Sequence, residues 1–147
     1  MSLVQLPRWI VAGASQAQRD LPHRTTIEVE AGLIASAQGR DLGNAFVTEV
    51  AEATLRFFDN KATVAAIEFA DRAAGLSSVL EQARATNQLL KSKVDVMDAM
   101  AYRRWLLSIA DTVISAARTG DFLGIGGKVV TAKEQSFRDR LVLVLQS

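Results

Sequence analysis

Apolar residues recur along most of this chain at intervals of three and four, the spacing that places side chains on one face of an α-helix. The clearest case follows Asp95, where charged residues fall between the apolar positions. Its apolar stripe consists of Met97, Ala101, Trp105, Ile109, Val113 and Ala116. This pattern predicts an amphipathic helix, the longest in the chain, that is capped by Ser92 or Asp95 and ends near Arg118.

Capping residues and glycines predict where the shorter helices begin and end. Thr25 and Glu28 form a capping box and Gly39 suits a left-handed C-cap, so one helix is expected between them. Thr131 and Glu134 form a second capping box, which predicts a final helix that continues to the terminus. The remaining helices are expected after Pro7, from about Asn44 to Phe58, from near Asn60 to Ala70, and, after a break at Gly75, from Ser77 to about Leu90.

The C-terminal segment LVLVLQS begins with five consecutive apolar residues, 141–145. On a helix these side chains would cover all sides, so a single neighbouring surface could not bury them all. The segment could occupy a deep slot, form part of an oligomer interface, or be a terminal strand. We favour a buried helix that also contributes to self-association.

Composition places these helices in one domain. The chain has 147 residues, of which 49% are hydrophobic, and contains two prolines. Domains of about 100–150 residues are the commonest size, and no linker or low-complexity tract divides this chain. We therefore expect a single all-α domain over residues 1–147, folded as a compact bundle of six or seven helices.

Charge and cysteine content exclude several classes of function. The 17 basic and 16 acidic residues leave a formal net charge of +1 without a long block of like charge, so no nucleic-acid partner is expected. The lack of cysteine excludes disulfides, thiol nucleophiles and zinc–thiolate sites. With His23 as the one histidine, neither a multi-histidine metal site nor a serine–histidine relay is expected within one subunit.

The N-terminal segment predicts neither export nor a membrane anchor. Arg8 interrupts its apolar stretch, and the longest uncharged run of the chain, from Trp9 to Gln18, is shorter than the ~18–20 apolar residues that span a bilayer. We therefore expect a cytoplasmic protein without a transmembrane segment.

The stretch TGDFLGIGGKVVTAKE, residues 119–134, holds four of the nine glycines and invites comparison with phosphate-binding loops. The P-loop pattern fails, because Phe122 stands at its first glycine position and Val129 at its hydroxyl position. An EF-hand that begins at Asp121 fails as well, since apolar residues occupy its ligand positions. We predict an ordered loop whose apolar side chains pack into the core while its glycines permit tight bends.

The other polar candidates have simple structural explanations. Carboxylates one helical turn apart, Asp95 with Asp98 and Glu49 with Glu52, could share a metal or a proton, but such pairs are more often solvated helix faces. The arginine pair at 103–104 is expected to be solvated, and the two tryptophans to anchor the core.

Two regions of the chain resemble each other. LIASAQGRDLGNAFVTE, residues 33–49, and VISAARTGDFLGIGGKVVTAKE, residues 113–134, both run from an alanine-rich helix end through glycine, aspartate and leucine to a threonine and a glutamate. Each predicts a helix–loop–helix hairpin. The two hairpins are either related by duplication and pseudo-twofold symmetry, or alike because helix hairpins in general use the same types of residue to end one helix and begin the next.

The stretch AYRRWLLSIADTVISAARTGDFLGIGGKVVTAKE, residues 101–134, resembles the C-terminal part of a set of uncharacterised bacterial helical proteins. The doubled pattern of alanine-rich helix, glycine with an acid, and glutamate-bearing helix is also similar to tellurite-resistance protein B and its relatives. That resemblance implies an all-α fold of two similar halves and an association with metal and stress responses.

The resemblance also implies candidate binding positions. These are the loop acids Asp41 and Asp121, with Glu49 and Glu134 at the following helix starts. The chain departs from the pattern where an acid should precede each loop glycine, because it has Gln38 in the first half and a threonine in the second. The resemblance therefore favours the fold more than metal binding.

Three hypotheses for function follow. The first is a non-enzymatic interaction or scaffold module, a homo-oligomer or the partner of another protein, that needs no cofactor. The second is a tellurite-resistance-like stress-response protein with a weak divalent-cation or small-ligand site near Asp41 and Asp121. The third, an enzyme that uses a carboxylate pair, has the least support.

Overall fold

The computed structural model describes residues 2–16, 22–58, 69–120 and 132–146 of the chain. Its helices are α1 (Ser2–Gln16), α2 (Pro22–Gln38), the 3-10 helix η1 (Gly39–Asp41), α3 (Ala45–Phe58), α5 (Arg72–Lys93), α6 (Val96–Gly120) and α7 (Ala132–Gln146). No strand occurs in these ranges, so the predicted all-α fold class is confirmed.

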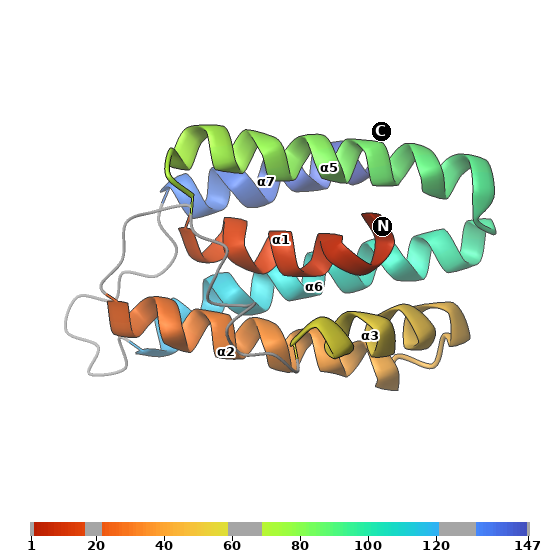
Figure 1. The fold of residues 1–147 in the computed structure, drawn as a ribbon, viewed down its shortest axis with the longest axis horizontal. Helices are drawn as coiled ribbons and strands as arrows, with labels where there is room; N and C mark the ends of the chain where they lie inside the picture. Colours follow the sequence, from red (N-terminus) through yellow and green to blue (C-terminus); the bar gives the residue numbers. More distant parts are fainter. Residues whose placement is uncertain (1, 17–21, 59–68, 121–131, 147) are drawn as a thin grey trace.

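The helices alternate in direction and form three layers, with α5 and α7 on one side, α1 and α6 in the middle, and α2 and α3 on the other (Figure 1). The two middle helices contact both outer layers, so their buried faces form the centre of one hydrophobic core. The largest fully buried apolar side chains are Trp105, Tyr102, Leu6, Ile10, Leu90, Leu106, Ile109, Leu141 and Leu145.

Two predicted N-caps are present. The side chain of Asn44 accepts a hydrogen bond from the Val47 amide at 2.9 Å, directly before α3. The side chain of Asp95 accepts one from the Met97 amide at 3.1 Å, directly before α6. These contacts satisfy amide groups that have no partner within the helix, which is why the two boundaries could be predicted locally.

The boundaries predicted near the N-terminus are wrong. Helix α1 begins at Ser2, so Pro7 lies inside it rather than before it. This is tolerated because the Leu3 carbonyl, which loses the amide of residue 7 as its partner, accepts a hydrogen bond from the Tyr102 hydroxyl at 2.8 Å. Helix α2 begins at Pro22, a residue suited to the first helical position, so Thr25 lies within the helix and does not cap it.

Two glycines were predicted to end or break helices, and both serve close packing instead. Gly39 is not left-handed; among the glycines that the structure describes, the one with positive φ is Gly43, at 75°. A Cβ on Gly39 would lie 2.5 Å from Nε1 of Trp105, so a side chain there would collide with the indole. Gly75 lies inside α5, where a side chain would collide with the Phe69 ring. Helix α5 begins at Arg72, before Gly75, and its N-cap is Asp71.

The C-terminal segment is helical to Gln146, which excludes the terminal strand. Leu141, Val144 and Leu145 are buried, as predicted, whereas Leu143 is 67% exposed. The long stripe of α6 is wrong at its first position, because Met97 is 69% exposed. Three predictions fall largely or wholly outside the described residues: the helix near residues 60–70, the capping threonine Thr131, and the glycine-rich loop at 121–131.

Both predicted hairpins consist of neighbouring helices. Helix α2 contacts α3, and α6 contacts α7. The helices of each pair run in opposite directions (Figure 1). Whether the two hairpins arose by duplication stays a prediction.

Candidate functional site

The four carboxylates implied by the family resemblance do not form one described cluster. Asp41 in η1 and Glu49 on α3 are exposed, whereas Glu134 in the first turn of α7 is 2% exposed. The start of α7 and the segment η1 lie at opposite ends of the bundle (Figure 1). Asp121 lies outside the described residues. Within the described ranges, no group of three or more histidines or carboxylates is arranged to hold a metal ion.

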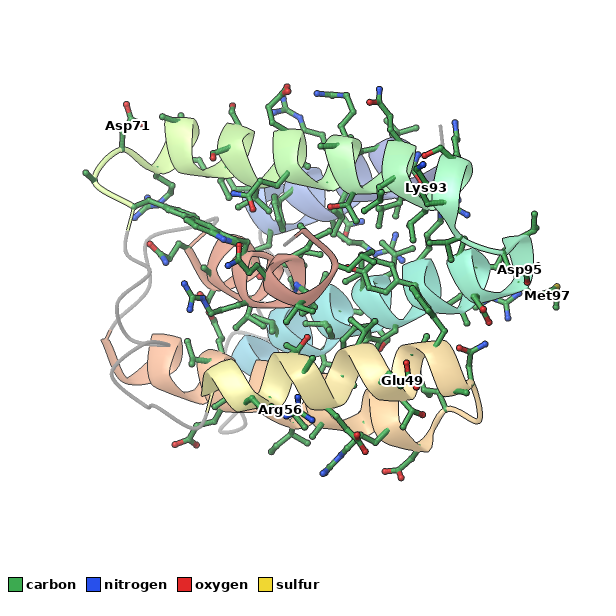
Figure 2. The ribbon with its side chains drawn as sticks, turned by 45° about the vertical axis from the view of Figure 1, so that its right-hand side comes forward. Glu49, Arg56, Asp71, Lys93, Asp95 and Met97 are labelled. Carbon is green, nitrogen blue, oxygen red and sulfur yellow. The ribbon has the colours of Figure 1, made fainter. Side chains whose placement is uncertain are left out.

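Exposed apolar side chains gather instead at the end of the bundle where α5 turns into α6. Val96 is 70% exposed, Met97 69% and Met100 39%. The connection is short: Val94 has an extended backbone and its amide donates to the Leu90 carbonyl at 3.2 Å. The first turn of α6 therefore projects from the bundle, with Met97 pointing outward (Figure 2).

A hollow of about 460 Å³ lies beside this turn, between the end of α5, the start of α6 and the end of α7. We call it the α5–α6 hollow. The buried residues Leu90, Ala99 and Leu145 form its apolar floor. Val94, Val96 and Met100 form apolar walls. The remaining lining residues are the cations Lys91 and Arg103 and the amide Gln146.

Two of the side chains that line the α5–α6 hollow are cationic. Its described lining contains Lys91 and Arg103 but no carboxylate. Two acids lie close to this lining: Asp95, directly before α6, caps the helix, and Asp98 in its first turn accepts a hydrogen bond from the Asn44 side-chain amide at 3.1 Å.

Polar contacts hold the first half of α6 in place against three other helices. Asp98 binds Asn44, which caps α3, and the Tyr102 hydroxyl binds the Leu3 carbonyl of α1. Arg103 donates from Nε to the side-chain oxygen of the buried Asn87 on α5, at 2.9 Å. The position of the hollow is therefore set by side chains from every layer of the bundle.

Tyr102 itself is buried and is not a candidate acid or base. Its hydroxyl is used in the contact with Leu3, and burial raises its pKa well above the ordinary value. The ring packs edge-on against Trp105, with centroids 5.8 Å apart, and against Phe46 at 6.3 Å. These contacts give Tyr102 a structural role.

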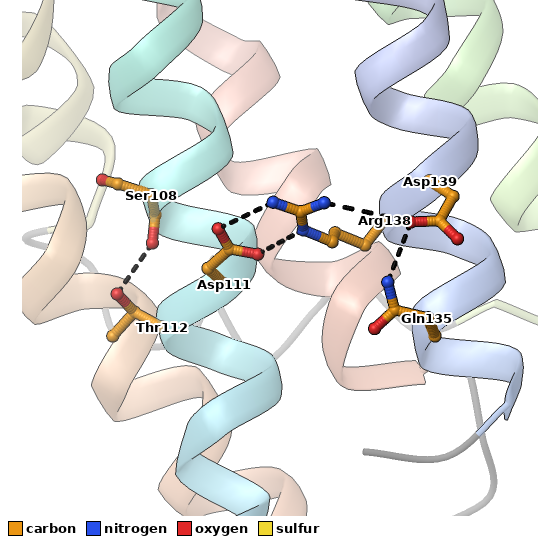
Figure 3. A network of polar contacts seen from close by, with 6 residues as sticks. All are labelled: Ser108, Asp111, Thr112, Gln135, Arg138 and Asp139. Atoms are coloured by element: carbon orange, nitrogen blue, oxygen red, sulfur yellow. Dashed lines mark hydrogen bonds and ion pairs between the residues drawn. The ribbon is translucent and has the colours of Figure 1, made fainter.

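A second polar cluster joins α6 to α7 (Figure 3). Arg138 donates to both oxygens of Asp111, at 2.7 and 3.4 Å, and this hydrogen-bonded contact raises the pKa of Arg138. Asp139 accepts a hydrogen bond from the Gln135 amide at 2.8 Å. Because each of these charges has a described partner, the cluster is explained as a link between the two helices.

Sequence reasoning missed the α5–α6 hollow. It assigned Met97 to the core and Arg103 to solvent, because periodicity in one helix does not show where the neighbouring helices end. The available signal was that Val96, Met97 and Met100 extend the apolar positions of α6 around more than one face.

No protein-family model matches this chain, and neither does any curated protein or solved structure. The similarity to tellurite-resistance proteins therefore stays an expectation. Every helix in the described ranges is too short or too polar to cross a bilayer.

Proposed function

We propose that the protein is a non-enzymatic interaction module that associates with itself through the α5–α6 hollow. The observation that carries this proposal is the grouping of Val96, Met97 and Met100 around a hollow with a buried apolar floor. Apolar patches of this kind favour association with another surface, and methionine side chains adapt to the shape of a partner.

The chemistry of the hollow favours binding over catalysis. General acid–base catalysis needs a proton donor or acceptor that titrates near neutral pH and reaches the substrate. The titratable groups in the described lining are Lys91 and Arg103, and Arg103 is hydrogen-bonded to Asn87. A lining with a buried apolar floor and no carboxylate or histidine among its described residues suits the recognition of a surface better than the transfer of a proton.

Self-association is tested by analytical ultracentrifugation of the purified chain over a wide concentration range. We expect the average mass to rise with concentration. The substitution Met100→Lys places a third cation in the hollow and should weaken association at least about tenfold, because an apolar contact is replaced by a charge. Ala73→Lys adds the same charge at an exposed position in the first turn of α5 and should have no effect.

Two results would overturn the proposal. One is a wild-type chain that stays a monomer at every concentration. The other is a chain that associates equally well with and without Met100→Lys. Circular dichroism of each variant confirms that the fold is retained, which is expected because Met100 is 39% exposed.

A further inference from the structure

Two exposed methionines lie at the start of α6, beside the α5–α6 hollow. The chain has three methionines and no cysteine, and two of the three are Met97 and Met100, three residues apart on this helix. Met97 is 69% exposed and points away from the bundle (Figure 2). Met100 is 39% exposed and lines the hollow. Both side chains are therefore accessible to a small solute.

The chemistry that such a pair of thioethers offers is oxidation. Accessible sulfur-containing side chains react first with an oxidant, and in this chain no thiol competes with the methionines. With hydrogen peroxide the reaction is a two-electron oxygen transfer. A lone pair of the sulfur attacks one peroxide oxygen, the S–O bond forms as the O–O bond breaks, and the departing oxygen takes up the proton and leaves as water. The sulfur is oxidised to the sulfoxide and the peroxide is reduced.

Oxidation of Met100 changes the hollow without entering the core. The sulfoxide turns a flexible apolar side chain into a polar one. Its oxygen would stand in an apolar wall of the hollow, beside the buried floor. Covering that oxygen with an apolar surface is unfavourable, because it would lose its hydrogen bonds with water. Met97 is not among the described lining residues, so its oxidation leaves the wall apolar.

We propose that Met97 and Met100 form an oxidation site, and that conversion of Met100 to the sulfoxide by a peroxide switches off association through the α5–α6 hollow. The inference rests on the proposed self-association and adds its regulation. Met97 reacts first because it is the more exposed. Met100 reacts in the free monomer, where the hollow is open, and is protected when a second copy covers it. Association and oxidation therefore compete for the same side chain.

The test treats the purified chain with hydrogen peroxide, locates the sulfoxides by peptide mass spectrometry, and measures association by analytical ultracentrifugation. Met100→Leu and Met97→Leu are the matched pair, because leucine conserves the volume and forms no sulfoxide, and both variants keep Met1. After oxidation, the wild type and Met97→Leu should associate at least about tenfold more weakly, whereas Met100→Leu should associate as before.

The switch should also be reversible. Methionine sulfoxide reductases of both stereospecificities, with a dithiol as reductant, should restore association as the sulfoxide oxygen leaves as water and the dithiol becomes a disulfide. Oxidation of Met100 should slow as the protein concentration rises through the range of association. Circular dichroism should show an unchanged helix content after oxidation, since both side chains lie outside the fully buried core.

The outcomes separate this inference from the proposed function. A chain that carries the Met100 sulfoxide and associates like the unmodified chain overturns the switch, while self-association through the hollow stands. The same holds if Met100 stays unreacted once Met97 is fully oxidised, if its rate is the same at every protein concentration while the mass rises, or if oxidation unfolds the chain. A wild-type chain that never associates overturns both proposals.

Discussion

The contact between Tyr102 and Pro7 allows a sharp test of how the core is held together. Proline has no amide hydrogen, so Pro7 leaves the carbonyl four residues earlier, that of Leu3, without its helical partner. The Tyr102 hydroxyl supplies the missing hydrogen bond from α6 at 2.8 Å. Two features far apart in the sequence therefore compensate for each other.

Tyr102→Phe removes the hydroxyl and keeps the ring in its packing with Trp105. We expect the free energy of unfolding to fall by about 1–2 kcal/mol, because a partly buried carbonyl is left without a donor. In a Pro7→Ala background, the new amide of residue 7 can bond the Leu3 carbonyl within the helix. Tyr102→Phe should then cost less, and the double-mutant cycle should give a coupling free energy of about 1 kcal/mol.

The assay is urea unfolding followed by circular dichroism, with the free energy obtained by linear extrapolation. Thr54→Val is the matched control, because the Thr54 hydroxyl lies within hydrogen-bond distance of the Val4 carbonyl, at 3.0 Å, and of the Val50 carbonyl, at 2.8 Å, and can donate to either. The helical partner of Val4 is the amide of Arg8, which Pro7→Ala does not change, so the effects of Thr54→Val and Pro7→Ala should add. Equal costs of Tyr102→Phe in both backgrounds would refute the reasoning, since the loss would then not depend on the missing proline amide.

Three further predictions concern other contacts. Tyr102 is the one tyrosine of the chain and burial raises its pKa, so its tyrosinate absorbance in the near ultraviolet should appear only when the chain unfolds. The free energy of unfolding should therefore fall as the pH rises above about 10, the pKa of tyrosine in the unfolded chain. Ionisation of Tyr102 in the folded chain would contradict this prediction. Gly39→Ala should cost about 1–3 kcal/mol in urea unfolding through its collision with Trp105, and an unchanged stability would mean that the indole yields freely. Arg138→Met should cost about 0.2–1 kcal/mol, less at high salt, because the partner Asp111 is half-exposed; a loss independent of salt would contradict the ion pair.

The helices were predictable because their signals are local. Apolar spacing and the caps at Asn44 and Asp95 act within a few residues, and the structure confirms both caps. The glycine predictions failed for the opposite reason. Gly39 looks like a helix stop in sequence, but its role is set by Trp105, which reaches it from a helix distant in the chain.

The candidate site was less predictable than the fold. The hollow is lined by the end of α5, the start of α6 and the end of α7, and no single segment carries the information that these three meet. Its cations, Lys91 and Arg103, are separated in sequence and meet only when the turn between their helices forms.

The core contacts and the proposed docking surface meet on α6. Asp98, Tyr102 and Arg103 bind three different helices within little more than one helical turn, directly beside the hollow. Each contact fixes a side chain or a helix position before any partner arrives. Docking costs less free energy when the contacting surface is already ordered, because less conformational freedom is lost on association. The buried hydroxyl that compensates for Pro7 thus also helps to keep the α5–α6 hollow in the shape that a second copy would meet.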